Sequence, residues 1–264
     1  MSLPWILASS LLAACGQNTN LSEVSIIGLA TNPDNGEIRY CEHHYIENNS
    51  SFGEPPELTT SQASHTESST THKVRIEYRG IDHNLFAVKQ LNYLDNDFAR
   101  PEVYQQDLRQ GEVRQAQWVD PKRLLLSYRA NRNETQEELV LNEQNVSVID
   151  AGFDHFVRAH WQQLIDSESL PLGFASPVHQ RNLSLRVRLL AMEECTVPKH
   201  PKAQYCFWVE ADSAWLRWLL EPLVLQYDQQ KRLVRYRGIV NLVDHEGAAI
   251  NANIDYRYCP CDPG

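Results

Sequence analysis

From Glu37 onward, the chain consists mainly of short segments in which apolar and polar residues alternate. These segments are rich in β-branched and aromatic residues, and Gly, Pro, Asn or Asp separates them, which is typical of strands joined by turns. Short hairpin turns at 228–231 and 244–247 indicate that neighbouring strands run antiparallel. The predicted strands are 37–45, 74–79, 85–94, 102–108, 112–119, 123–130, 138–141, 183–191, 205–211, 222–228, 232–242 and 250–258.

Residues 152–166 lie between the predicted strands 138–141 and 183–191. In this segment the spacing of the apolar positions changes from two residues to 3.6. Apolar and aromatic side chains recur there with helical spacing, which predicts one amphipathic helix. Asp150 is a candidate N-cap, and Asp154 and Arg158 have the i,i+4 spacing of a helical ion pair. We therefore expect an α+β fold, in which a twisted antiparallel sheet packs on one long helix. The stripe consists of Phe153, Phe156, Val157, His160, Trp161, Leu164 and Ile165.

The remaining segments define the expected domain organisation. Residues 1–14 form an apolar leader, 15–36 form a polar tether, and 37–264 form a single domain. A tract at about 46–72 is rich in Ser, Thr, Asn and Pro and has few aliphatic residues, so we expect a disordered loop or insertion there. Residues 213–220 could form a short helix or a strand.

Composition and motifs exclude several classes of function. The net charge of −10 argues against a nucleic-acid surface. The sequence has no G-x-S-x-G nucleophile elbow, phosphate-binding loop or H-E-x-x-H zinc motif, which argues against common hydrolases and nucleotide enzymes. His160 could be a base held by Asp154, but the spacing favours a core histidine bonded to a backbone carbonyl. We expect no catalytic residue and no cofactor.

The leader ends in Leu12-Ala13-Ala14-Cys15. This tetrapeptide resembles the lipobox of bacterial lipoproteins, in which the cysteine is lipidated and becomes the mature N-terminus. The resemblance implies a signal peptide over residues 1–14, palmitate on Cys15 and a membrane as partner. Gly16 follows the cysteine, which by the same resemblance implies an outer-membrane protein that faces the periplasm. A multiply acylated cysteine binds a membrane stably.

The other cysteines allow two interpretations. Cys195 and Cys206 flank a proline-containing segment and are predicted to form a disulfide, while Cys41 could pair with Cys259 or Cys261. Alternatively, Cys41, His43, Cys259 and Cys261 could bind a metal or carry redox chemistry, because thiolates and imidazoles suit zinc and copper. The C-x-C spacing is unusual for such a site, so disulfides are favoured and no metal is expected.

Five arginines alternate with apolar residues in the last strands, and each group should project from one side of its strand. If the strands are neighbours, the arginines could form a basic stripe that binds an anionic head group or a carboxylate. The alternative is a solvated face on which they pair with Glu and Asp. These residues are Arg186, Arg188, Arg235, Arg237 and Arg257.

A curved sheet around a helix resembles the half-barrel of periplasmic lipoprotein carriers of the LolA and LolB type. Residues 232–242 (RLVRYRGIVNL) and 250–258 (INANIDYRY) also resemble the C-terminal end of uncharacterised proteobacterial envelope proteins. The leading hypothesis is a non-enzymatic envelope lipoprotein that binds an apolar or amphipathic ligand, or an envelope protein, on its sheet. The alternatives are the metal or redox protein described above and a structural subunit of an envelope complex.

Overall fold

The computed structural model describes residue 15 and residues 23–47, 72–213 and 221–259. The strands in these ranges form one 15-stranded sheet in the order β8-β7-β6-β5-β4-β3-β2-β1-β15-β14-β13-β12-β11-β10-β9. Every pairing is antiparallel except the short parallel contact between β9 and β10. The predicted signal peptide over residues 1–14, the tract at 48–71, residues 214–220 and Cys261 lie outside the described residues.

The chain forms two successive meanders. The first contains β1 (Ile26–Thr31), β2 (Ile38–Glu47), β3 (His72–Arg79), β4 (Leu85–Tyr93), β5 (Glu102–Asp107), β6 (Val113–Asp120), β7 (Arg123–Arg129) and β8 (Glu137–Asn142). A 3-10 turn, η1 (Glu143–Asn145), leads to β9 (Val148–Ile149), α2 (Gly152–Ala159) and α3 (Trp161–Asp166). The second meander contains β10 (Leu170–Ser176), β11 (Arg181–Leu190), β12 (Tyr205–Ala211), β13 (Leu223–Tyr227), β14 (Leu233–Val243) and β15 (Ala249–Tyr258).

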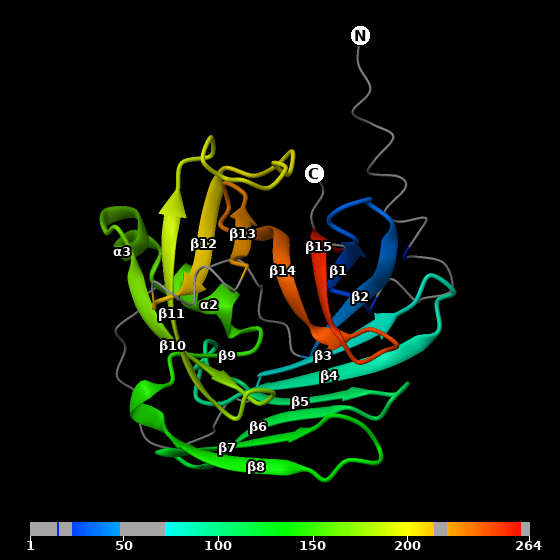
Figure 1. The fold of residues 1–264 in the computed structure, drawn as a ribbon. Coiled ribbons are helices and arrows are strands. Elements are labelled where there is room, and N and C mark those ends of the chain that lie inside the picture. Colours follow the sequence, from blue (N-terminus) through cyan, green and yellow to red (C-terminus); the bar gives the residue numbers. More distant parts are fainter. Residues whose placement is uncertain (1–14, 16–22, 48–71, 214–220, 260–264) are drawn as a thin grey trace.

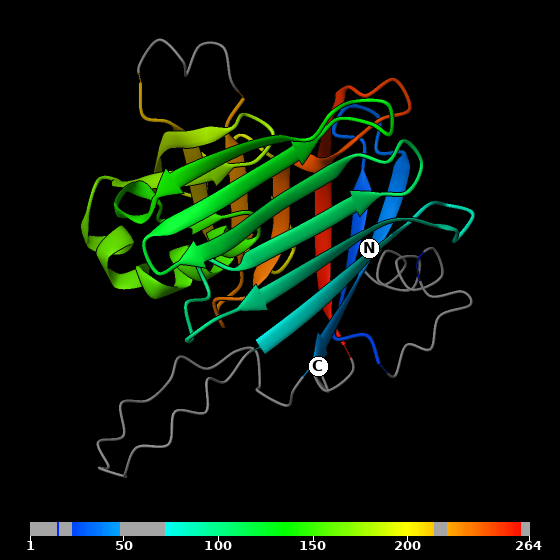
Figure 2. The same cartoon turned by 90° about the horizontal axis from the view of Figure 1, so that it is seen from below.

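The two meanders become one sheet because the first and last strands pair. In the centre of this seam, Ile27 of β1 lies opposite His43 of β2 on one side and Arg257 of β15 on the other. The continuous sheet curls so that β3–β8 form one layer and β10–β15 form a second (Figure 1). Seen from below, the strands of the first layer cross those of the second at a steep angle (Figure 2).

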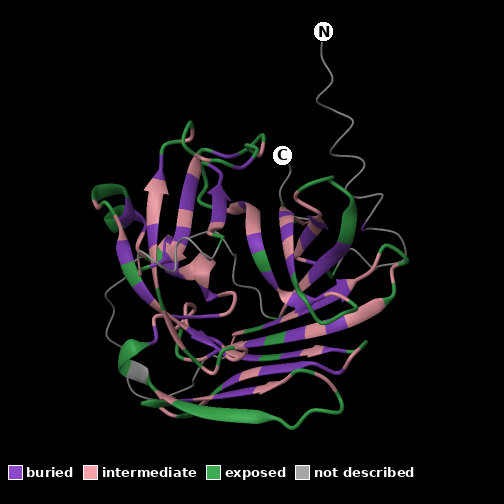
Figure 3. Ribbon diagram, viewed as in Figure 1, coloured by how far each residue is buried: buried purple, intermediate pink, exposed green. Residues whose placement is uncertain are grey.

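The core fills the concave face between these layers. One cluster of buried residues joins β2–β7 to β14 and β15, with Leu91, Leu126 and Ile254 among its members. A second cluster packs α2 and α3 against β10–β13, and its centre is Trp161. The Trp161 ring lies 4.9 Å from Tyr205 and 5.0 Å from Phe207, both in edge-on geometry. Burial alternates along most strands, whereas β8 at the sheet edge is exposed over most of its length (Figure 3).

The predicted α+β class with one long helix is wrong, because the described chain is nearly all β. Most of the apolar stripe over 152–166 faces the sheet, but Ile165 is 42% exposed, and the helix is broken at His160, where φ is −103° and ψ is 19°. His160 still packs against the predicted apolar stripe, because its ring stacks on that of Phe156 with the ring centroids 4.2 Å apart. The predicted pair between Asp154 and Arg158 is present, at 2.8 Å.

The predicted tether over 15–36 is also wrong in its second half, because β1 lies inside it. The sequence Ile26-Ile27-Gly28-Leu29-Ala30-Thr31 is short, apolar and partly β-branched, as expected for a strand that is buried by neighbours on both sides. Gly28 is closely surrounded by side chains of the neighbouring strands. An added Cβ would lie 3.1 Å from a carboxylate oxygen of Glu42 and 3.1 Å from the ring of Tyr256.

A buried polar network connects the two layers at Asp150. This residue does not cap α2, whose N-cap is Ala151 and has no side-chain hydrogen bond. Instead, the Asp150 carboxylate accepts a hydrogen bond from Lys89 Nζ on β4 at 2.5 Å and from Asn241 Nδ2 on β14 at 2.5 Å. Its φ of +47° is left-handed, a region that Asp and Asn adopt more readily than most residues.

Candidate functional site

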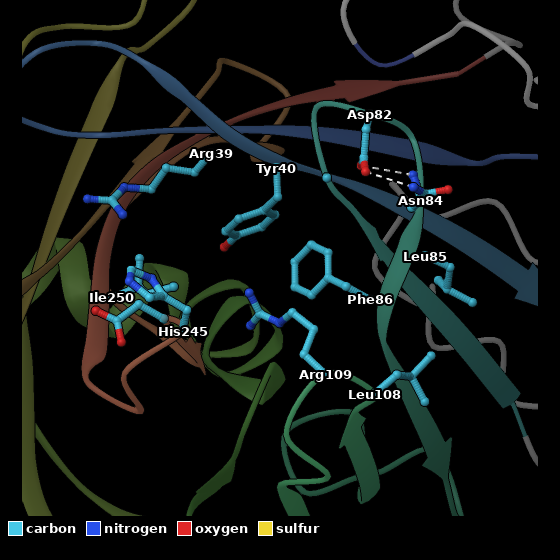
Figure 4. Close-up of a pocket in the computed structure, with 12 residues that line it drawn as sticks. Arg39, Tyr40, Asp82, Asn84, Leu85, Phe86, Leu108, Arg109, His245 and Ile250 are labelled. Atoms are coloured by element: carbon cyan, nitrogen blue, oxygen red, sulfur yellow. Dashed lines mark hydrogen bonds between the residues drawn. The ribbon is translucent and has the colours of Figure 1, made fainter.

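A cavity of about 600 Å³ lies at one end of the curled sheet, where strand ends from both layers meet. The beginning of β2, the β3–β4 turn and the β5–β6 turn contribute one side. The β14–β15 hairpin contributes the other side (Figure 4). Its lining consists of Arg39, Tyr40, Gly80, Asp82, Asn84, Leu85, Phe86, Leu108, Arg109, Asp244, His245 and Ile250.

Aromatic and aliphatic side chains form the inner wall of this cavity. The ring of Tyr40 packs edge-on against Phe86, with the ring centroids 6.0 Å apart, and against Tyr78 at 5.9 Å. Leu108 lies nearer the mouth and is 38% exposed, while Ile250 is 9% exposed. A wall of this composition can contact the apolar part of a ligand, and the volume falls in the range typical of small-molecule sites.

The Tyr40 hydroxyl is the innermost polar group. The residue is 2% exposed, and the hydroxyl oxygen is buried without a hydrogen-bond partner among the described residues. Figure 4 shows this hydroxyl directed toward the space between Ile250, Phe86 and Arg109. Burial raises the pKa of Tyr40 well above its ordinary value, so the group stays protonated and can donate a hydrogen bond.

Two arginines line the cavity, and they differ in whether a carboxylate pairs with the guanidinium. Arg109 is held by the buried Asp107 carboxylate, which accepts from its Nε at 3.1 Å and its Nη2 at 2.6 Å. The Arg109 guanidinium also lies 4.3 Å from the Phe86 ring centre, a cation–π contact. Arg39 is exposed and has no ion-pair partner among the described side chains. The positive charge of Arg39 is therefore the uncompensated one.

The acidic residues of the lining are occupied by turn hydrogen bonds at the rim. Asp82 accepts from Asn84 through both the backbone N–H, at 3.2 Å, and the side-chain amide, at 2.7 Å. Asp244 accepts from the backbone N–H groups of Glu246 and Ala248, each at 2.9 Å. These hydrogen bonds lower the pKa of both carboxyl groups. The inner polar atoms are thus donors, and the acceptors lie at the rim.

The cysteines form two disulfides in the described chain, Cys195–Cys206 and Cys15–Cys41. The spacing predicts the first. The second differs from the expected pairing of Cys41 with Cys259 or Cys261; Cys259 is a free thiol here. Disulfides persist in oxidising compartments, so the protein belongs outside the cytoplasm.

The Cys15–Cys41 bridge also affects two predicted sites. It occupies the sulfur of Cys15 that the lipobox resemblance assigns to a lipid, and one sulfur cannot form both bonds. It removes Cys41 as a thiolate ligand, and the ring Nε2 of His43 lies 2.9 Å from the Cys15 carbonyl oxygen. No group of three metal-binding side chains occurs within the described ranges.

The sheet brings the five predicted arginines onto its convex face, but it does not assemble them into one anion site. Arg186 pairs with Glu210 at 2.5 Å, and Arg235 pairs with Asp255 at 2.5 Å. Arg188 lies 3.8 Å from Glu210 and 5.9 Å from the Trp208 ring centre. The remaining two are Arg237, on β14, and Arg257, which is exposed on β15. Much of their charge is therefore neutralised by neighbouring carboxylates.

His160 contacts the backbone, as a histidine with a structural role does. Its ring Nδ1 lies 2.9 Å from the carbonyl oxygen of Phe156, one helical turn earlier. Asp154, the partner that a catalytic base would need, pairs with Arg158 instead. His160 belongs to no group of three metal-binding side chains among the described residues.

Comparisons of the chain with protein-family models, with curated proteins and with solved structures find no match. The resemblance to lipoprotein carriers and to envelope proteins therefore stays a prediction. Among the described residues, no helix has the length and apolar character needed to cross a membrane.

Sequence reasoning did not identify the cavity residues, which come from four separate turns and strand ends. Tyr40 lies in a predicted strand, but nothing in its neighbourhood distinguishes it from a core tyrosine. Arg109 lies between the predicted strands 102–108 and 112–119, and nothing in the sequence indicates that this connection meets β15. Only the pairing of β1 with β15 brings these segments together.

Proposed function

We propose that this protein is a non-enzymatic extracytoplasmic binding protein that takes an amphipathic small molecule into the cavity at the end of its sheet. The observation that supports the proposal most strongly is the combination of an aromatic wall with an unpartnered buried hydroxyl. Burying an unsatisfied hydroxyl is unfavourable, so a ligand oxygen that accepts from Tyr40 would recover part of that cost.

The apolar part of the ligand would contact Phe86, Leu108 and Ile250. Two rings and two aliphatic side chains at the cavity can remove a short alkyl chain or a ring from water. At about 25 cal/mol per Å², burial of a chain of eight carbons would contribute several kcal/mol before the cost of association. We therefore expect dissociation constants in the micromolar range.

Attachment to a membrane through Cys15 stays a separate prediction of the lipobox resemblance. The outer-membrane location depends on that anchor, whereas the extracytoplasmic location is supported by the disulfides. A lipid on Cys15 would leave Cys41 without its present partner. The anchor and the bridge are therefore alternative states of one cysteine, and binding at the cavity requires neither.

A fluorescence titration with 11-(dansylamino)undecanoic acid tests the binding proposal. Leu108→Glu places a carboxylate in the lining and should weaken binding of the probe at least tenfold. Leu139→Glu is the matched control, because Leu139 is 37% exposed against 38% for Leu108 and lies on the edge strand β8, outside the lining. Both variants should keep the thermal midpoint of the parent.

Two results would contradict the proposal. One is the absence of any saturable fluorescence change up to about 100 μM probe, which is well above the expected affinity. The other is equal affinity for the parent and Leu108→Glu, which would place bound probe elsewhere on the molecule.

A further inference from the structure

We infer that the cavity selects ligands that present a hydrogen-bond acceptor oxygen, a carboxylate or an acyl carbonyl, at the inner end, where Tyr40 binds it. This inference rests on the proposed function and adds the chemistry and the orientation of the ligand. The ligand enters with its polar oxygen first and leaves its apolar part against the wall nearer the mouth.

The first step of the argument is the protonation state of the inner polar atoms. The Tyr40 phenol is kept neutral by burial, so its hydroxyl proton is available, and no acceptor for it occurs among the described residues. Arg109 lies nearby in the lining, is exposed, and as a cation can only donate hydrogen bonds. The inner end of the cavity therefore presents donors, and a ligand group that is itself only a donor has no partner there.

The second step concerns charge. Because Asp107 neutralises Arg109, the inner end can accept either a neutral carbonyl or a carboxylate. Arg39 at the mouth adds a positive charge that attracts a carboxylate. Asp82 and Asp244 are held ionised at the rim by turn N–H groups and act in the opposite direction. The acceptor oxygen is therefore the requirement that the inner end imposes, and Arg39 and the rim carboxylates oppose each other in the choice between a carboxylate and a neutral carbonyl.

The third step separates binding from folding. Tyr40→Phe deletes a buried hydroxyl that has no partner, so it removes a desolvation penalty and no protein hydrogen bond. The variant should therefore be as stable as the parent or more stable. A structural tyrosine with a satisfied hydroxyl would behave in the opposite way, because its partner would be left unpaired.

Three eight-carbon ligands test the selection by displacement of the dansyl probe. Octanoate and methyl octanoate carry the acceptor oxygen, and octyltrimethylammonium has neither an acceptor nor a donor. We expect octanoate to bind about tenfold more tightly than octyltrimethylammonium, since a charge-assisted hydrogen bond contributes roughly 1.5–3 kcal/mol. Methyl octanoate distinguishes the two sources of the oxygen: affinity equal to that of octanoate assigns recognition to the carbonyl, and weaker binding assigns part of it to the anionic charge.

Variants connect this preference to named residues. Tyr40→Phe should weaken octanoate about tenfold, leave octyltrimethylammonium unchanged and keep or raise the urea midpoint. Tyr104→Phe, on an exposed residue outside the lining, is its control. Arg39→Gln should weaken octanoate about threefold and methyl octanoate less. Lys122→Gln removes an exposed positive charge in the β6–β7 turn, outside the lining, and should change neither.

The inference is overturned if octyltrimethylammonium binds as tightly as octanoate, or if Tyr40→Phe binds octanoate like the parent. In both cases the proposed function stands, because an apolar chain still occupies the cavity. If none of the three ligands displaces the probe and the probe itself does not bind, the proposed function fails together with the inference.

Discussion

The buried pair between Lys89 and Asp150 offers the sharpest test of how the two layers are joined. The side chains of the two residues are 5% and 10% exposed, and Lys89 Nζ lies 2.5 Å from Asp150 Oδ1. Asp150→Asn leaves the backbone conformation accessible, because Asn also adopts φ near +47°. The substitution removes the negative charge and leaves a buried ammonium group without its counter-ion.

The expected cost follows from two opposing contributions. With an effective dielectric constant of about 20, two unit charges 2.5 Å apart attract each other by ~7 kcal/mol. Desolvation of both ions offsets much of this attraction in the parent, but the variant keeps the penalty for Lys89 and loses the attraction. Removal of one partner from a buried pair typically costs about 3–5 kcal/mol. We expect a loss in this range for Asp150→Asn.

Urea unfolding of a double-mutant cycle measures this cost. Lys89→Met replaces the amine with an apolar group of similar length, and the double variant Lys89→Met with Asp150→Asn has no buried charge at this position. It should lose less stability than the sum of the two single variants, by at least about 1 kcal/mol. Asp97→Asn is the control, because its pair with Arg100 is partly exposed and should contribute under about 1 kcal/mol. A loss below about 1 kcal/mol for Asp150→Asn would refute the assignment of this pair as a buried connection.

Three further predictions concern other parts of the fold. Trp161→Ala should cost about 3–5 kcal/mol in urea unfolding, because Trp161 is 4% exposed at the centre of the second core cluster; an unchanged midpoint would contradict that packing. Burial lowers the pKa of His155 to about 4, whereas the unfolded chain titrates near 6.5. The folded state thus binds fewer protons, so this group's contribution is fully present above pH 6.5, and up to ~3 kcal/mol is lost as the pH falls toward 4. His155→Phe should flatten the slope of unfolding free energy against pH over this window, and an unaltered slope would argue against a buried neutral imidazole. Non-reducing peptide mapping should recover Cys15 linked to Cys41, and recovery of an acylated Cys15 peptide would instead establish the lipid anchor.

The alternation of apolar and polar residues identifies most of the strands because one face of each is buried. Along β4, for example, Ala87, Lys89 and Leu91 face the core while intervening residues face outward. The same pattern does not predict that Lys89, a charged residue, is buried at a core position. Its partner Asp150 is 61 residues away, and no local signal joins the two.

Two predictions, the single helix over 152–166 and the tether over 15–36, are wrong because the local sequence pattern does not determine the structure at these places. The helical stripe continues through His160, so periodicity predicts one helix, although the chain bends there as the His160 ring contacts the Phe156 carbonyl. The six residues of β1 are flanked by polar residues and resemble part of a linker. Their composition is compatible with a buried strand, but only the pairing with β2 and β15 along both edges distinguishes them from a linker.

The cavity could not be predicted because its residues are determined by long-range register. Tyr40 and Ile250 face the same space only when β1 connects β2 to β15 in the observed alignment. A shift of one residue in either pairing would turn the intervening side chains to the other face.

The position of β1 also has a consequence for biosynthesis. This strand is made long before its partner β15, since Ile26 lies opposite Tyr258. Until then β1 has an open edge of unpaired backbone groups, which invites association with other chains. The local hairpins of each meander can form quickly, whereas closure of this contact must await β15 and should be slow. A nascent chain halted before residue 249 would therefore hold two half-sheets with unmatched edges. We expect it to depend on a holding chaperone until β15 has been made.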